Sequence, residues 1–146
     1  MITPSHCPPT FWRVLQRFAV ESGLPLYVID VKDAFLNVPQ PGKVVVTAPQ
    51  QLSGYEGCMW ELNRLLPGQR EGTSEWSKLA TKLLQESGME VYEPCPVLFK
   101  GTGELKSVRV QMHVDDLLMC GLPEEVNVLL ERFAAQVEKF LLSRQV

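Results

Sequence analysis

The sequence is short of several features that mark common classes of protein. Nowhere do its 146 residues hold an apolar run near the ~20 residues of a membrane-spanning helix. The chain does not open with a basic segment followed by an apolar stretch, as a secretory signal peptide does. We therefore expect an intracellular protein that is not secreted and has no membrane partner. A Gly-rich phosphate loop followed by Lys and Ser or Thr is missing as well, which excludes a P-loop NTPase.

The sequence also has no closely paired cysteines and no surplus of positive charge. The four cysteines include no CxxC pair, which argues against a zinc site. They could form two disulfides, but reduced and mostly buried thiols are the better interpretation. The 14 Lys and Arg do not balance the 17 Asp and Glu, so the net charge is −3. A free-standing nucleic-acid binder normally carries a basic surplus, so charge alone argues against that class.

The sequence contains enough apolar residues to form the core of one domain over residues 1–146. With 45% hydrophobic and 21% charged residues, the chain can bury a core. Apolar residues at helical spacing predict three helices, the first two capped by Thr10 and Ser74 and the third opened by Pro123. Short apolar, β-branched runs predict strands at residues 26–31, 43–48, 58–62, 91–92, 97–100, 107–114 and 117–120. The first of them is predicted to be buried. We expect an α+β fold, a mostly antiparallel sheet with helices packed on one face.

Two places put carboxylates where apolar residues are expected. Asp30 interrupts the apolar run over residues 26–31, and burial of an unpaired carboxylate is unfavourable. Taken alone, Asp30 is better explained as the end of the strand and a cap for the next turn. Asp115 and Asp116 separate two apolar strands and could form an ordinary hairpin tip, because Asp favours turns. Adjacent like charges repel each other, however, and a bound cation would relieve that repulsion.

Together the two places suggest a specific chemistry. A sheet can bring a strand-end Asp beside a pair of Asp residues at a hairpin tip, which would supply oxygen ligands for two hard divalent ions such as Mg²⁺. Two such ions ~4 Å apart support in-line phosphoryl transfer. A Ca²⁺-binding structural domain that uses the same carboxylates is a weaker alternative, because the sequence holds no EF-hand loop pattern.

Three motifs in order resemble one protein family. Residues 28–37 (VIDVKDAFLN) are similar to the DVKTAFLNG signature of the reverse transcriptases of copia-type LTR retrotransposons. Residues 60–76 (WELNRLLPGQREGTSEW) line up without a gap on that family's WKLNKSLYGLKQAPRAW, and residues 113–118 (HVDDLL) resemble its YVDDLL box. The resemblance runs from about Phe11 to the last predicted helix. Three ordered motifs are far more specific than any one of them.

The resemblance implies a polymerase palm that uses two Mg²⁺ ions, or Mn²⁺ in their place, to add deoxynucleotides to a primer 3′ end. By motif matching, Asp30 and Asp115 would hold the metals, with Asp116 as the third catalytic carboxylate and metal ligand. The carbonyl of Val31 would complete a metal shell. The implied partners are an RNA or DNA template with its primer, dNTPs, and the rest of a retrotransposon polyprotein, including integrase and RNase H. The implied location is a cytoplasmic particle or the nucleus of the host cell.

Three residues that follow the first motif's aspartate match the family's nucleotide-binding positions. The resemblance implies that Asp33 and Ala34 line the triphosphate through their backbone N–H groups. Phe35 falls where the family places a bulky aromatic against the sugar 2′ position, which rejects ribonucleotides by steric clash. The alternative for Phe35 is ordinary core packing.

The second and third motifs imply further substrate contacts and also contain departures from the family. Gly68 would allow close backbone approach under the nascent base pair. Arg70 would lie near template or phosphate, or else is a solvated loop charge. His113 replaces the usual Tyr near the primer end. Glu71 and Glu75 put negative charge in a loop expected to face template or nucleotide, where repulsion should weaken binding.

Two functional hypotheses follow. The first is an RNA-directed DNA polymerase palm of a copia-type element, with its fingers incomplete and its thumb and RNase H portions absent. The second is a truncated or domesticated relic that folds and serves as a non-catalytic interaction module. The three intact aspartates favour the first hypothesis, whereas the altered loop over residues 71–75 and the short length favour the second.

Overall fold

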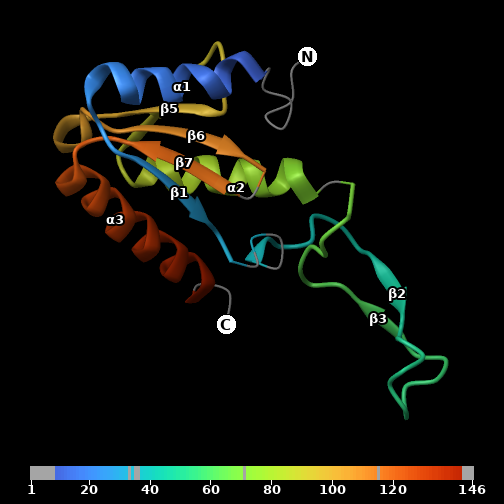
Figure 1. Cartoon of the computed structure of the whole chain (residues 1–146). Helices are drawn as coiled ribbons and strands as arrows, with labels where there is room; N and C mark the ends of the chain where they lie inside the picture. Colours follow the sequence, from blue (N-terminus) through green and yellow to red (C-terminus); the bar gives the residue numbers. More distant parts are fainter. Residues whose placement is uncertain (1–8, 33, 35–36, 71, 115, 143–146) are drawn as a thin grey trace.

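The computed structural model describes residues 9–32, 34, 37–70, 72–114 and 116–142. Within them the chain order is α1 (Pro9–Ser22), β1 (Leu26–Asp30), β2 (Val45–Thr47), β3 (Met59–Glu61), α2 (Gly72–Glu86), β4 (Met89–Val91), β5 (Leu98–Gly101), a 3₁₀ turn (Gly103–Leu105), β6 (Arg109–His113), β7 (Asp116–Cys120) and α3 (Pro123–Leu142) (Figure 1). The predicted α+β class is therefore confirmed. Each predicted strand corresponds to an observed one, with ends that differ by at most two residues.

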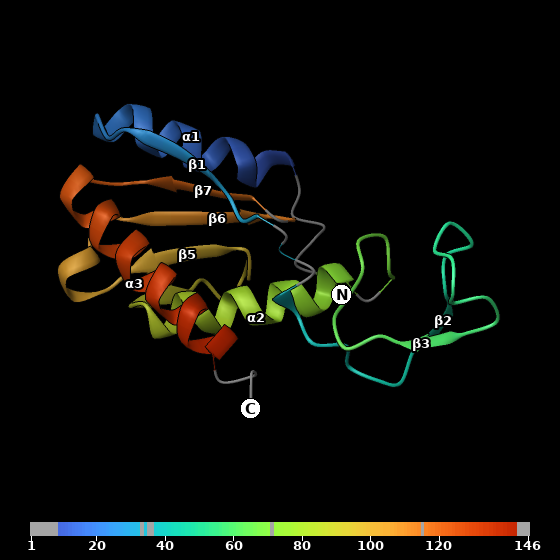
Figure 2. The same cartoon turned by 90° about the horizontal axis from the view of Figure 1, so that it is seen from below.

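Five strands form one antiparallel sheet in the order β1-β7-β6-β5-β4. Successive residues of a strand point to opposite faces, and the two faces of this sheet meet different helices. Leu117 and Met119 join the large core that α2 and α3 cover, whereas Leu118 and Cys120 pack against α1. Figure 2 shows α1 on one side of the sheet and α2 and α3 on the other. Helices were expected on one face only, so α1 corrects that detail of the prediction.

The helix α1 ends where the sequence predicts, at a glycine. Gly23 adopts φ +65°, a left-handed conformation that glycine reaches without a steric penalty. The N–H of Leu24 donates to the carbonyl of Ala19 at 2.9 Å, and the N–H of Gly23 donates to that of Val20 at 3.2 Å. This pair of hydrogen bonds is a Schellman motif, which satisfies the last carbonyls of a helix. The motif turns the chain directly into β1.

The strand β1 is less buried than predicted. It is an edge strand whose residues alternate between exposed and half-buried, and Val28 is 67% exposed. A run of apolar residues is expected to be covered on both faces. Here the second face of β1 is only partly covered, and nothing pairs with its outer edge among the described residues. The prediction of a buried strand was therefore wrong.

The helices α2 and α3 supply most of the core on their side of the sheet. Trp76, Ala80 and Leu84 of α2 are buried, as the helical spacing predicts. The start of α2 differs from the prediction: the helix includes Gly72, so Ser74 lies inside its first turn and is not the N-cap. Pro123 opens α3 as predicted. These α3 residues are buried: Val126, Leu129 and Phe133.

The strands β2 and β3 form a separate two-stranded arm. They pair Val45 with Glu61 and Thr47 with Met59, and the arm projects away from the five-stranded sheet in both ribbon views (Figures 1 and 2). At its tip the ring of Tyr55 meets Trp60 edge to face, with centroids 5.6 Å apart. An aromatic pair of this kind helps to hold a short hairpin that has little other packing.

Of the described cysteines, Cys95 and Cys120 are buried, as predicted, whereas Cys58 is exposed. Burial raises the pKa of the Cys120 thiol, and the nearby charge of Arg109 offsets part of that rise. None of the helices in the described ranges is long and apolar enough to span a bilayer.

Candidate functional site

The candidate site lies at one end of the sheet, where β1 ends and β7 begins. Asp30 is the last residue of β1, Asp116 is the first residue of β7, and the two are direct partners in the antiparallel register. Residues directly opposite in such a pair project to the same face, with Cβ atoms about 4.5–5.5 Å apart. The fold thus joins two carboxylates that the sequence places far apart. Asp30 is exposed and Asp116 is half-buried.

A tight hairpin brings the third motif into this position. The strand β6 ends at His113 and β7 begins at Asp116, so two residues separate the strands. Val114 adopts φ +54°. A β-branched residue in the left-handed region is strained by about 1–3 kcal/mol, and tight two-residue hairpins require such an angle. The predicted hairpin is confirmed, but Asp116 belongs to β7 and not to the tip, and Asp115 lies outside the described residues.

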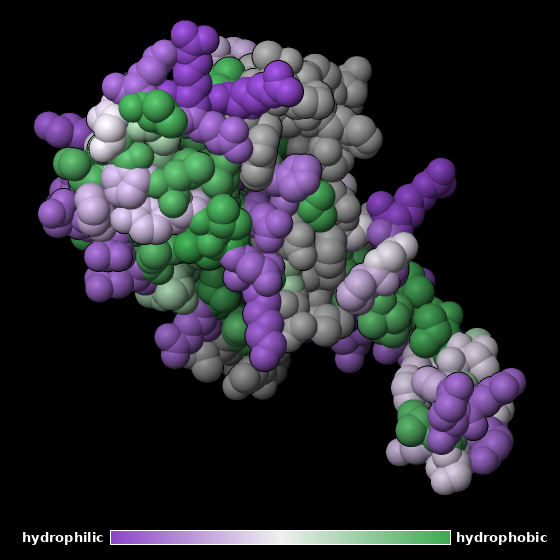
Figure 3. Space-filling model, viewed as in Figure 1, coloured by the Kyte–Doolittle hydropathy of each residue, from purple (hydrophilic) through white to green (hydrophobic). Residues whose placement is uncertain are grey.

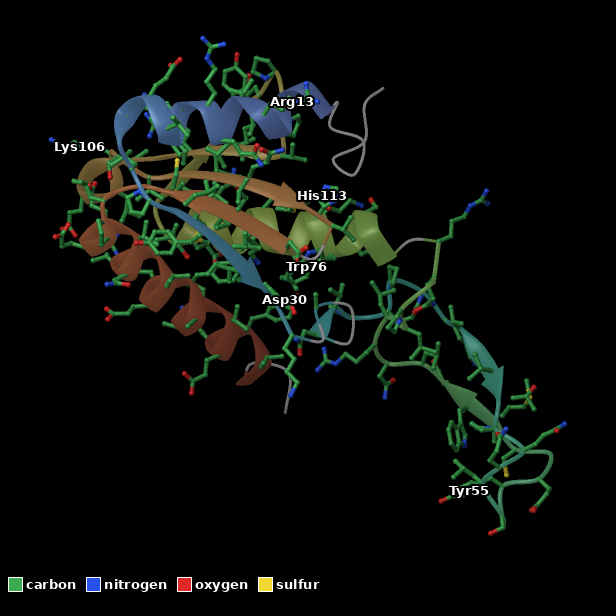
Figure 4. The ribbon with its side chains drawn as sticks, viewed as in Figure 1. Arg13, Asp30, Tyr55, Trp76, Lys106 and His113 are labelled. Carbon is green, nitrogen blue, oxygen red and sulfur yellow. The ribbon has the colours of Figure 1, made fainter. Side chains whose placement is uncertain are left out.

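His113 extends the pair of carboxylates into a row. It is the register partner of Asp116 on the opposite side from Asp30, so one row across β6, β7 and β1 carries an imidazole and two carboxylates on one face. Figure 4 shows Asp30 and His113 at the same end of the sheet, away from the end where Lys106 lies. Within the described ranges, no three His, Cys, Asp or Glu side chains come close enough together to enclose a metal ion. The set predicted from the motifs includes Asp115, which those ranges omit.

Gln111 is a further polar residue on the same face, and no sequence motif indicated it. Gln111 of β6 is 2% exposed, and its Oε1 accepts no hydrogen bond in the structure as described. It lies between Leu98 of β5 and Leu118 of β7, one row inward from His113. The alternation of polar Arg109, Gln111 and His113 with apolar Val110 and Met112 could have placed it on this face.

The structure places the other residues of the first motif only in part. Val31 directly follows β1 and is half-buried. Ala34 is 3% exposed and belongs to the large core, and its carbonyl accepts a hydrogen bond from the N–H of Asn37 at 3.3 Å. Asp33 and Phe35 lie outside the described residues, so the two alternatives for Phe35 stay open.

Gly68 and Arg70 lie in the loop between β3 and α2. Gly68 adopts φ +90°, and no atom lies within 4 Å of the position that a Cβ would take, so its backbone angle rather than crowding requires glycine. Arg70 is exposed, which agrees with either of its predicted roles. The structure does not bring either residue into the row formed by Asp30, Asp116 and His113.

Gln69 fixes this loop, a role that no motif indicated. Its Oε1 accepts a hydrogen bond from the N–H of Leu66, and its Nε2 donates to Oε1 of Gln40 at 3.0 Å. The N–H of Gln40 in turn donates to the carbonyl of Asn63 at 3.1 Å. The segment after the first motif and the loop of the second motif are therefore tied together through a glutamine pair.

The structure is an antiparallel sheet flanked by helices. One carboxylate ends an edge strand, and another begins the neighbouring strand after a tight hairpin. This arrangement is that of a polymerase palm. A family model described as reverse transcriptase (RNA-dependent DNA polymerase) matches residues 10–143. Because this match spans most of the chain, the chain belongs to the reverse transcriptase family, whose enzyme class is RNA-directed DNA polymerase. No curated protein matches the chain closely enough to be reported as a relative.

Proposed function

We propose that this chain is the catalytic palm of a copia-type retrotransposon reverse transcriptase, which adds dNTPs to a primer 3′ end by two-metal nucleotidyl transfer. The observation that carries the proposal is the register pairing of Asp30 with Asp116 on one face. Two like charges directly opposite each other destabilise a sheet. A cation bound between the two carboxylates would offset this penalty.

The donor chemistry of the site fits magnesium. Carboxylate oxygens are hard ligands that suit Mg²⁺ and Mn²⁺, and the exposed Asp30 leaves one side of the site open to solvent and substrate. Asp30, Asp115 and Asp116 would hold the ions, with the carbonyl of Val31 as a further ligand. When bound, the two ions would supply positive charge at the attacking and leaving oxygens of the in-line displacement.

The other motif residues would bind and orient the substrates. Asp33 and Ala34 would donate backbone N–H groups to the triphosphate, and Phe35 would exclude the ribose 2′-hydroxyl by steric clash. Gly68 would let the loop backbone approach the nascent base pair.

Two more residues would contact the nucleic acid. Arg70 is exposed and carries the positive charge that a template phosphate or the triphosphate requires. His113 would lie beside the primer terminus, because it is next to Asp116 in the row and is exposed. The wider partners that we propose are a primed RNA or DNA template and the remaining polyprotein with its integrase and RNase H, inside a cytoplasmic particle or the nucleus. On this view, residues 1–146 are the palm portion, and fingers and thumb elements complete the grip on the duplex.

Primer extension tests the proposal. The chain, and a version extended at both ends with the flanking polyprotein, would be assayed on poly(rA) primed with oligo(dT), with Mg²⁺ or Mn²⁺. We expect incorporation by the extended version that falls at least ~10²-fold in Asp116→Asn and in Asp30→Asn. Glu90→Gln on β4 is a matched control, because Glu90 is an exposed acid far along the sheet from the site.

Two outcomes would contradict the proposal. Incorporation that persists in Asp30→Asn would exclude the metal-binding role of this residue. A folded extended version with no incorporation under either metal would favour a relic that serves as a non-catalytic interaction module.

A further inference from the structure

An open groove lies on the α1 side of the sheet, the face that also carries Asp30 and Asp116, but neither of these carboxylates lines it. It runs between α1 and the strands β5 and β6 and has a volume of about 330 Å³. Its walls are almost wholly apolar, with Val14 and Phe18 from α1 facing Leu98 from β5 and Tyr92. Val14 is 50% exposed and Tyr92 is 52% exposed, so both would lose water contact when the groove is filled.

Two cations stand side by side at this groove. Lys100 of β5 and Arg109 of β6 both line it, and they are direct register partners on the same face. Like charges directly opposite each other destabilise a sheet. The ion pairs formed among the described residues involve neither of them. Glu90 of β4 is the register partner of Lys100 on its other side, so the row Glu90-Lys100-Arg109 keeps one net positive charge.

The guanidinium of Arg109 is already held in place. Its Cζ lies 5.2 Å from the centroid of the Phe18 ring, a cation–π contact. Its Nη1 donates to the carbonyls of Lys106 and Val108, each at 2.9 Å. A guanidinium carries five N–H donors, so these two bonds leave donors on its other nitrogens. A positive charge that is fixed beside an apolar wall can pair with an anion without much loss of side-chain freedom.

The size of the groove and the charges beside it suit a small ligand with an anionic group. Ligand pockets for small molecules span about 300–1,000 Å³, and this groove lies at the lower end of that range. We propose that the groove binds a small amphipathic carboxylate, with its hydrocarbon or aromatic body between α1 and β5 and its carboxylate at Lys100 and Arg109.

Calorimetric titration with decanoate, below its micelle concentration, tests this inference on the full chain. The neutral isologue decanol and the cation decyltrimethylammonium serve as comparison ligands. We expect saturable binding of one decanoate per chain, about fivefold tighter than decanol, because an exposed ion pair contributes up to ~1 kcal/mol. The cation should bind more weakly than decanol.

Variants at groove residues, each matched with a variant outside the groove, test whether decanoate binds there. Val14→Asp should abolish decanoate binding, whereas Val20→Asp should not, because Val20 is an 81% exposed valine of the same helix that does not line the groove. Lys100→Gln should remove the preference for decanoate over decanol. Lys106→Gln, which changes an exposed lysine outside the groove, should keep it.

Several results would overturn the inference. Equal affinity for decanoate and decanol would show that the carboxylate does not contribute to binding. Binding that survives Val14→Asp in a variant with unchanged circular dichroism would place the ligand elsewhere. Sedimentation that shows a concentration-dependent dimer, dissociated by Val14→Asp, would mean that a second copy of the chain covers the groove.

Discussion

Asp30 and Asp116 lie directly opposite each other across β1 and β7, so two carboxylates share one face at the end of the sheet. Without a divalent ion, replacing either with Asn should stabilise the fold by a few tenths of a kcal/mol, because a like-charge pair is removed. Millimolar Mg²⁺ should raise the melting temperature of the wild-type chain, since a ligand that binds only the native state stabilises it. Thermal melts with Mg²⁺ and with EDTA check this. A Mg²⁺ shift of equal size in Asp116→Asn would contradict the pairing as a metal site.

Val114 is the one described non-glycine residue with a left-handed backbone angle, φ +54°. Val114→Gly should stabilise the fold by about 0.5–1 kcal/mol, because the relief of strain exceeds the extra chain entropy that glycine brings. Chemical denaturation measures the change. The control is Val28→Gly in β1, where the backbone is extended, and we expect a loss of about 0.5–1 kcal/mol there. Destabilisation by both substitutions would show that the turn is not strained.

Gly101 lies where β5 passes close to the 3₁₀ turn. A Cβ at this position would lie 1.7 Å from the carbonyl oxygen of Leu105, so backbone atoms would have to move. Gly101→Ala should therefore destabilise the fold by about 2–4 kcal/mol. Gly42→Ala is the control, because no atom lies within 4 Å of its Cβ position and its backbone angle is ordinary. Equal midpoints of urea unfolding for the two variants would refute the close approach.

Ser107 and Glu125 join the start of β6 to the first turn of α3. The carboxylate of Glu125 accepts hydrogen bonds from the hydroxyl and the N–H of Ser107, and that hydroxyl accepts one from the N–H of Leu122 at 3.1 Å. The hydrogen bond from the Ser107 hydroxyl lowers the pKa of Glu125.

Because the pKa of Glu125 is lowered in the native state, its contribution to stability depends on pH. The native state favours the ionised carboxylate, so the contribution is present above the unfolded pKa of about 4.5 and is lost as pH falls through the lowered native value. Glu125→Gln should cost about 1 kcal/mol or less at pH 7 and nearly nothing at pH 3. Unfolding by urea at both pH values measures the difference. A deficit in Glu125→Gln that grows toward pH 3 would contradict this assignment.

Periodicity predicted most of the elements because local spacing reflects which face of an element is buried. The apolar positions of α2 and α3 confirm this, since Trp76, Leu84 and Leu129 are all buried. Caps were less predictable: Ser74 favours an N-cap, yet α2 starts earlier, at Gly72. Packing of a helix against the sheet can override the preference of one capping residue.

The motifs predicted which residues belong to the candidate site, but they did not predict how those residues are arranged. The motifs named Asp30, Asp116 and His113, and only the strand order β1-β7-β6 puts them in one row. Gln69 and Gln40 carried no motif signal, because a hydrogen bond between two loops far apart in the sequence leaves no periodic pattern. The catalytic and binding roles of all the site residues stay predictions, and Asp115, Asp33 and Phe35 also lie outside the described residues.

Residue types and their local order were enough to predict the family and the α+β class and to name the candidate acids. Contacts between distant segments set which face of the sheet each helix covers. They placed α1 across the sheet from α2 and α3, left β1 as a partly exposed edge, and set Lys100 beside Arg109 at an apolar groove. Strand order and register are set by contacts between distant segments, and no local pattern of residues encodes those contacts.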